Sequence, residues 1–222
     1  MIPVRDDNPT RSVPFVTILL IAVNVAVFFY ELSLGTGHEA NAFFANFALV
    51  PAEIVREPSS EAVRSAFTSM FLHGGWLHLI GNMWFFWIFG NNIEDSVGHF
   101  KFVVFYLLCG IAAAAAQVLS APDSRLPMIG ASGAISGVLG AYLLLFPRAR
   151  VLAVVPIWIF LRFIYVPAWL MLIFWFVLQL FSGWATLRMT QGGVAFWAHV
   201  GGFVAGLALI PLFKKRNVRL FQ

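Results

Sequence analysis

The chain of 222 residues has little charge, because Asp, Glu, Lys and Arg make up only 11% of it, whereas 60% of its residues are hydrophobic. A soluble domain carries about 25% charged residues, so this composition excludes an ordinary soluble protein. A spanning helix needs about 20 apolar residues to cross about 30 Å of hydrocarbon. Six such segments and their loops use nearly the whole chain, and we therefore expect an all-α, polytopic membrane protein with six transmembrane helices.

Cysteines and membrane-embedded acids are also scarce. The single Cys109 excludes an intrachain disulfide, and it lies in an apolar run where we expect inert packing. No Asp or Glu lies well inside a predicted span, which excludes an intramembrane aspartyl protease and argues against a proton-coupled transporter. His73 and His78 lack the spacing of a His-Glu-x-x-His zinc site. We therefore expect neither a metal nor a cofactor.

The apolar segments set the order of the chain. We predict spans at residues 14–30, 100–119, 130–146, 167–184 and 194–213, and one more within residues 67–91. Residues 34–65 form a long loop in which we expect short helices at the membrane interface. Residues 92–99 are predicted to be a short polar turn, and residues 182–193 a loop. Residues 151–162 are apolar but interrupted by Pro156, so we interpret them as an interfacial or hairpin-like connection rather than a span.

Basic residues set the expected orientation. With both termini inside, ten lie on the cytoplasmic side, namely Arg5, Arg11, Lys101, Arg148, Arg150, Arg162, Lys214, Lys215, Arg216 and Arg219. The other side holds the remaining four, so both termini are expected in the cytoplasm. The domain prediction is a cytoplasmic segment at residues 1–13, a six-helix membrane domain at 14–213 and a basic cytoplasmic tail at 214–222. Such clusters beside apolar runs are typical of membrane proteins, and we expect no nucleic-acid partner.

Residues 1–13 also bear on location. They lack the Arg- and Ser-rich, acid-poor composition of an organelle transit peptide. We therefore expect a multi-pass protein of a bacterial plasma membrane.

Polar residues inside spans are functional candidates, because burying them in a membrane is costly. His78 and Asn82 are four residues apart and share one face of the second span. Ser132 begins the fourth span and His199 lies near the start of the sixth, so both can sit at similar depth below the outer surface. A Ser–His pair can perform acyl transfer. The backbone N–H of Ser132 and the side chains of His78 and Asn82 are the candidate donors to an oxyanion.

Each of these residues also has a structural explanation. Gly133, Gly137 and Gly140 are as well suited to close helix packing as to supporting a nucleophile. A histidine beside glycines, as His199 is, more often forms a hydrogen bond within the packing, and His78 and Asn82 could link helices in the same way. The coincidence of four such residues on three helices at matching depth favours catalysis.

The chain resembles the rhomboid family of intramembrane serine proteases. The resemblance lies in three motifs and a turn: His73-x4-His78-x3-Asn82, Gly130-Ala-Ser132-Gly133, Ala198-His199 followed by Gly202 and Gly206, and Glu94-x3-Gly98. It implies that Ser132 is the nucleophile and His199 the base, and that His78, Asn82 and the Ser132 N–H bind the oxyanion. It also implies a structural role for His73, bonded to the adjoining loop, and close packing of the sixth helix on the fourth through Gly202 and Gly206.

The implied activity is hydrolysis of a transmembrane helix of a membrane-protein substrate near its outer end. The fifth helix would be a lateral gate against the second, and water would reach Ser132 through a polar cavity beneath the first loop. Many family members have an aromatic residue four positions after the serine, where this chain has Ser136. We expect another ring, from the fifth span, to support His199. The alternatives are an inactive relative that binds transmembrane helices and a small-solute channel.

Overall fold

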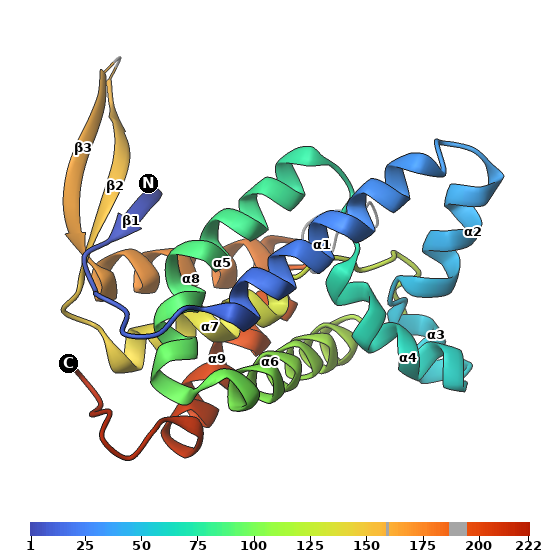
Figure 1. Cartoon of the computed structure of the whole chain (residues 1–222). Coiled ribbons are helices and arrows are strands. Elements are labelled where there is room, and N and C mark those ends of the chain that lie inside the picture. Colours follow the sequence, from blue (N-terminus) through green and yellow to red (C-terminus); the bar gives the residue numbers. More distant parts are fainter. Residues whose placement is uncertain (159, 187–194) are drawn as a thin grey trace.

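A computed structural model describes residues 1–158, 160–186 and 195–222, and it is predominantly a helical bundle (Figure 1). Its longer helices are α1 (Phe15–Ser33), α5 (Trp76–Val97), α6 (His99–Ser120), α7 (Ser132–Leu145), α8 (Ala168–Thr186) and α9 (Phe196–Phe213). Helix α7 is the central element, since it packs against α5, α6 and α9. The prediction of a loop at residues 182–193 is wrong at residues 182–186, which belong to α8, and its remainder lies outside the described residues.

Four helices in the described part of the chain are long and apolar enough to cross a membrane: α1, α6, α8 and α9. Helix α5 has 22 residues, but polar side chains are distributed along it. Helix α7 has 14 residues, which is about 21 Å of helix and less than the ~30 Å of a hydrocarbon core. The structure therefore supports a multi-pass membrane fold, whereas the count of six spans stays a prediction.

The end of the bundle remote from the chain termini is covered by short elements. Helices α2 (His38–Phe47), α3 (Pro51–Arg56) and α4 (Ser60–Thr68) confirm the prediction of short helices in the first long loop, and a 3₁₀ turn, η1 (Ser69–Phe71), follows them. Backbone hydrogen bonds tie these elements to the segment that leads into α7. Leu49 and Met128 bond reciprocally, and Gly130 N–H donates to the Ser69 carbonyl at 2.8 Å. These hydrogen bonds therefore fix the start of α7 against the short elements of the first long loop.

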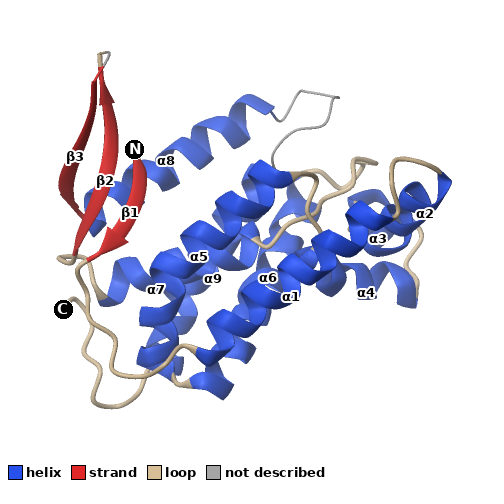
Figure 2. Cartoon of the chain, turned by 45° about the horizontal axis from the view of Figure 1, so that its top comes forward, coloured by secondary structure: helices blue, strands red, loops and turns tan. Residues whose placement is uncertain are grey.

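The expectation of an all-α chain is wrong at the other end of the bundle. Strands β1 (Ile2–Asp6), β2 (Arg150–Ile157) and β3 (Phe160–Pro167) form an antiparallel sheet in the order β1-β2-β3 (Figure 2). The hairpin interpretation of residues 151–162 is confirmed by the pairing of β2 with β3. Strand β1 was not predicted, because its partner lies about 150 residues away and has no local signal in the sequence.

Asp6 anchors strand β1 to the bundle. Its carboxylate accepts hydrogen bonds from the Tyr142 hydroxyl at 2.6 Å and from the Asn92 amide at 2.9 Å. Burial raises the pKa of the Asp6 carboxyl above its ordinary value. The N-terminal segment is therefore part of the folded bundle rather than a free extension.

The junction between α5 and α6 differs from the predicted polar turn at residues 92–99. Helix α5 continues to Val97, and the chain reverses at Gly98, whose φ of +90° suits glycine. The fully buried Glu94 accepts hydrogen bonds from the backbone N–H groups of Val16 (2.9 Å) and Thr17 (2.8 Å), and from the Thr17 hydroxyl (2.7 Å). A carboxylate at a helix N-terminus satisfies donors that have no partner within the helix. Glu94 therefore fixes the start of α1 against α5.

Helices α7 and α9 approach each other at the level of the backbone. A Cβ atom on Gly202 would collide with the carbonyl oxygen of Gly133, and one on Gly206 would collide with that of Gly137. Small residues permit such contact between helices in a membrane. The predicted packing of the sixth helix on the fourth through Gly202 and Gly206 is thus present in the structure.

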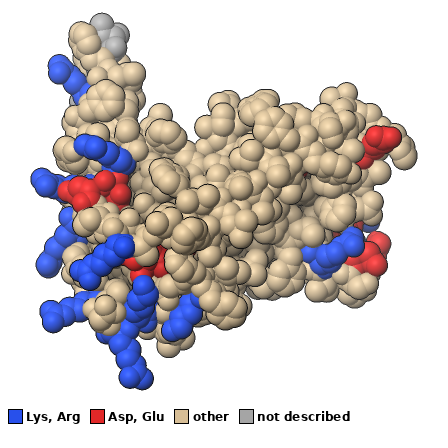
Figure 3. All heavy atoms as spheres, viewed as in Figure 1, with Lys and Arg blue, Asp and Glu red and all other residues tan. Residues whose placement is uncertain are grey.

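Basic side chains gather at the end of the bundle that carries both chain termini, and a smaller mixed group lies at the opposite end (Figure 3). This distribution is what the positive-inside rule leads one to expect if the termini are cytoplasmic. The orientation itself remains a prediction.

Candidate active site

Ser132 is the first residue of α7, and the segment before it has an unusual conformation. Gly130 has φ of +120°, and a Cβ atom built there would lie only 2.7 Å from Nε2 of His78. Glycine is required at this position both for the left-handed backbone and for the close approach of the His78 ring. The backbone therefore lies against the His78 ring two residues before Ser132.

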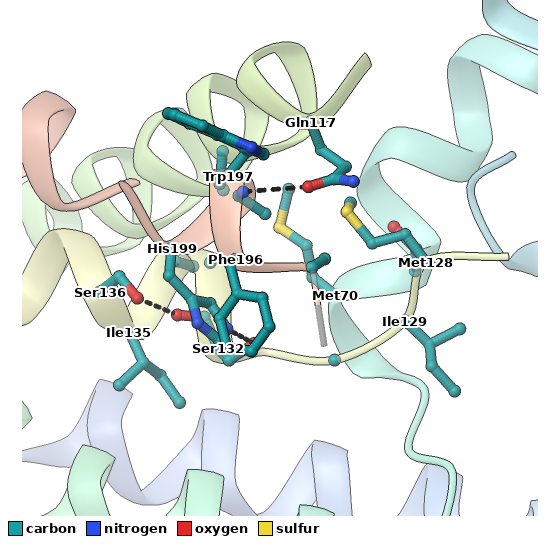
Figure 4. A pocket seen from close by; sticks show the side chains of 18 of the residues that line it. Met70, Gln117, Met128, Ile129, Ser132, Ile135, Ser136, Phe196, Trp197 and His199 are labelled. Atoms are coloured by element: carbon teal, nitrogen blue, oxygen red, sulfur yellow. Dashed lines mark hydrogen bonds between the residues drawn. The ribbon is translucent and has the colours of Figure 1, made fainter. Parts of the chain in front are cut away.

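His199 lies in the first turn of α9 and is only 8% exposed. Its Nε2 atom is 2.8 Å from Oγ of Ser132, and the two side chains point toward each other in Figure 4. The glycine contacts between α7 and α9 bring these two helix starts together. A hydroxyl beside an imidazole nitrogen at this distance is the geometry of a nucleophile with its general base.

The other ring nitrogen of His199 also has a partner. Nδ1 is 2.8 Å from Oε1 of Gln179, on α8. The Gln179 amide nitrogen lies 3.5 Å from the carbonyl oxygen of Trp175, to which it can only donate. The amide oxygen faces His199 in this arrangement, and an acceptor there suits the tautomer in which Nδ1 carries the proton and Nε2 accepts from Ser132.

Gln179 was not among the site residues predicted from the sequence. It is the one Gln, Asn or charged residue of α8, which is otherwise apolar or small. The rule that a polar residue inside a span is a functional candidate would have identified it.

His78 and Asn82 lie on α5 at the opposite side of the same site. The Asn82 side-chain nitrogen is 3.0 Å from Nε2 of His73, and the backbone N–H of His73 donates to the Glu31 carboxylate at 3.1 Å. The rings of His73 and His78 meet edge to face, with centroids 5.1 Å apart. The ring of His73 thus contacts Asn82, and its bond to the adjoining loop stays a prediction from the family resemblance.

One cavity of about 1240 Å³ contains the predicted side chains Ser132, His199, His78 and Asn82. It extends from Ser132 toward the loop before α7, where its lining includes Gln117, Asp123, Ser124 and Arg125. Figure 4 shows Gln117 at one side of this space, with its side chain bonded to the backbone of α9. A cavity is therefore present beneath the first loop, as expected, and apolar side chains line it together with the polar ones.

Ser136 takes no part in supporting His199. Its buried hydroxyl donates to the Ser132 carbonyl at 2.6 Å, one turn back along α7. The expected ring from the fifth predicted span is Trp175 of α8, whose centroid lies 5.9 Å from that of His199 with the planes inclined by 34°. Phe196 approaches His199 edge to face at 6.4 Å. Two rings and an amide therefore surround the imidazole.

A family model described as the Rhomboid domain matches residues 60–216 of this chain, which include Ser132, His199, His78 and Asn82. The chain belongs to the rhomboid family. It is 29% identical over 195 residues to Rhomboid protein 1, mitochondrial, of Saccharomyces cerevisiae, covering 85% of this chain and 50% of that protein. It is 28% identical over 193 residues to the Rhomboid protease GluP of Bacillus subtilis, covering 87% of this chain and 34% of that protein.

A third rhomboid relative is the Rhomboid protease AarA of Providencia stuartii, which is 28% identical over 141 residues, 56% of this chain and 48% of that protein. The chain thus spans half or less of the length of these curated relatives.

Proposed function

We propose that this chain is a serine endopeptidase that hydrolyses peptide bonds in or near transmembrane helices of membrane-protein substrates. The observation that carries this proposal is the 2.8 Å contact between Ser132 Oγ and His199 Nε2, inside a polar cavity of an otherwise apolar bundle. The names of two relatives, GluP and AarA, include the word protease, which supports the same reaction class for this chain.

The proposed reaction has two steps. Ser132 Oγ attacks the carbonyl carbon of the scissile peptide while its proton passes to Nε2 of His199. The C–N bond then breaks, the proton passes from His199 to the leaving amine, and an acyl ester on Ser132 remains. A water molecule next attacks the ester, and its proton returns through His199 to Ser132 as the acid product leaves.

The oxyanion formed in each step needs hydrogen-bond donors. The N–H of Ser132 is at the start of α7, where backbone donors have no partner within the helix. His78 and Asn82 line the same cavity, and the Asn82 amide has a second hydrogen beyond the one directed to His73. We assign these three groups to the oxyanion site, and His73 to holding Asn82 in place.

We also propose a six-span arrangement with both termini in the cytoplasm. Helix α7 is about 9 Å shorter than the hydrocarbon core, so Ser132 lies below the outer surface if the inner end of α7 is at the inner interface. Water then reaches it through the polar cavity. The two bacterial relatives support the bacterial plasma membrane as the location.

Covalent labelling tests the proposal. A fluorophosphonate probe should label the purified wild-type protein and leave Ser132→Ala and His199→Ala unlabelled. Ser33→Ala is the matched control, because Ser33 is an exposed serine at the far end of α1 that bonds only its own helix, and it should label normally. Equal labelling of wild type and Ser132→Ala would refute the assignment of the nucleophile.

The substrate class needs a separate measurement. The purified protein should cut some members of a panel of single-span membrane proteins, with cut sites mapped by mass spectrometry near the outer end of the span. If the protein binds such spans and neither cleaves them nor labels, the inactive alternative is correct.

A further inference from the structure

We propose that Gln179 is the third member of the site, a positioning residue that fixes the catalytic tautomer of His199 and makes that tautomer depend on the placement of α8. This inference rests on the proposed function, because it concerns the base of the same reaction. It is carried by the geometry of the Gln179 amide and by the distribution of the three residues over three helices.

The first step concerns the proton on His199. A neutral imidazole carries one proton, and the base can accept from Ser132 only when that proton is on Nδ1. Oε1 of Gln179 is 2.8 Å from Nδ1, and an oxygen at that position stabilises the tautomer with an Nδ1 proton. In the alternative tautomer Nδ1 carries no proton, and its lone pair would face a lone pair of the same oxygen, which is unfavourable.

The second step concerns the amide itself. A flip of the Gln179 amide would exchange its oxygen and nitrogen. The NH₂ group would then face Nδ1 and favour the tautomer in which Nδ1 carries no proton. The Trp175 carbonyl, 3.5 Å from the amide nitrogen, favours the observed orientation through a long and weak contact, because it can accept a hydrogen bond and cannot donate one. Gln179 and Trp175 are four residues apart on α8, so the helix supplies its own means of orienting the amide.

The third step concerns the alternatives for this role. Ser136 bonds the carbonyl of Ser132, and the rings of Trp175 and Phe196 contact the faces and edges of His199. A ring can limit the rotation of an imidazole but offers no acceptor to its Nδ1 proton. Among the described residues, the side-chain acceptor placed on Nδ1 is therefore Gln179.

The final step follows from the helices involved. Ser132 is on α7 and His199 on α9, whereas Gln179 is on α8. The contact between Gln179 and His199 exists only while α8 rests against α9. A displacement of α8 away from α9 would release Nδ1, and return of α8 would restore the catalytic tautomer. The position of α8 therefore regulates the base.

The other titratable groups near His199 are few. His78 faces it across the cavity from α5. Helices α7, α8 and α9 contain no Asp, Glu, Lys or Arg, and His99 and Lys101 of α6 lie at the far end of that helix. Asp123 and Arg125 line the same cavity near the loop before α7, so the pH profile of each Gln179 variant is compared with that of the wild type, which carries the same two charges.

The test uses two substitutions of similar size and the rate at which a fluorophosphonate labels Ser132, measured from pH 4 to 9. Gln179→Met removes the acceptor and should slow labelling about 10-fold, which corresponds to the loss of one hydrogen bond. Gln179→Glu keeps an acceptor and adds negative charge, which stabilises the protonated ring. Because only the neutral ring is a base, the acidic limb of the rate profile should move to higher pH by about one unit or more.

Leu178→Met is the control, since Leu178 is the neighbouring residue on α8, is 45% exposed and should leave the profile unchanged. A wild-type rate in Gln179→Met would overturn the proposal. So would equal losses in the Met and Glu variants with an unmoved acidic limb, because that pattern indicates a purely structural role. If wild type itself fails to label at Ser132, the proposed function fails first, and the two failures are thus distinguishable.

A second readout does not need the reaction. In Ser132→Ala protein with ¹⁵N-labelled histidine, the NMR shifts of the His199 ring should show a protonated Nδ1 and a bare Nε2. The signal is identified by its loss in Ser132→Ala/His199→Ala. Adding Gln179→Met should produce a mixture of tautomers, and an unchanged spectrum would overturn the role of Gln179.

Discussion

The two helix pairs that assemble the site are built in different ways. Helices α7 and α9 meet through glycines, with backbone against backbone, and every residue from Gly133 to Tyr142 is buried. Helices α8 and α9 meet through rings, as in the stacked pair Phe176 and Phe203 with centroids 4.6 Å apart. Much of α8 is exposed, including the large side chains of Trp169, Leu170, Ile173, Phe174, Val177, Leu178, Phe181 and Trp184.

This difference separates two requirements of the proposed chemistry. The distance between the nucleophile and the base must be constant. It is set by the glycine contacts between α7 and α9, which can change only if the backbone of a helix moves. The orientation of the base is set by a helix held only through side chains, which can repack at lower cost. The fixed pair therefore holds the reacting atoms, and the adjustable pair is suited to admitting a substrate from the membrane.

Breaking the fixed pair should have the largest effect. Gly202→Val places a branched side chain against the carbonyl of Gly133, and only separation of α7 from α9 can relieve the collision. We expect a loss of about 4 kcal/mol or more in the free energy of unfolding, seen as a large drop in Tm in detergent. Gly81→Val is the control for stability, because a Cβ atom at Gly81 meets no atom within 4 Å. Equal Tm values for the two variants would mean that α7 and α9 are not in contact at Gly202.

The same contrast explains which parts of the fold could be predicted from the sequence. The glycines of α7 and α9 recur on one helix face, so a local pattern indicates their close packing. The sheet depends on pairing between β1 and β2, which are far apart in the chain, and local periodicity contains no information about that pairing. Glu94 lies in a segment that was predicted to be a polar turn, and a charged residue inside a span is costly. The cost is offset by three hydrogen bonds from α1 that only the structure reveals.

The candidate site was predicted more fully than the sheet. Ser132, His199, His78 and Asn82 could be identified because each is a polar residue in an apolar segment and their helices begin at the same side. Gln179 satisfies the same criterion, yet its partner could not be inferred, because α8 carries no small-residue pattern to show which face meets α9. Many family members have an aromatic residue at the position of Ser136, and we expected a ring of the fifth span to replace it. Only the structure identifies that ring as Trp175.

A second prediction tests whether α5, which packs against α7 of the fixed pair, carries an oxyanion donor. Asn82→Ala should slow labelling and substrate turnover by about 10-fold or more, because one donor to the developing charge is removed. The fold should be retained with a smaller Tm change than in Gly202→Val, since the lost contact with His73 is a single hydrogen bond. An unchanged turnover rate would remove Asn82 from the oxyanion site.

The smallest effect on labelling should come from a change in the adjustable pair, α8 and α9. Trp175→Leu removes the ring beside His199 but retains the backbone carbonyl that orients the Gln179 amide. An aromatic contact contributes about 0.5–1.5 kcal/mol, so labelling of Ser132 should slow by only ~3-fold, with the acidic limb of the pH profile unmoved. Trp175→Phe keeps a ring and should recover most of the rate. If Trp175→Leu slows labelling more than Gln179→Met does, the ring rather than the amide orients His199, because the amide and its carbonyl partner are both still present in the leucine variant.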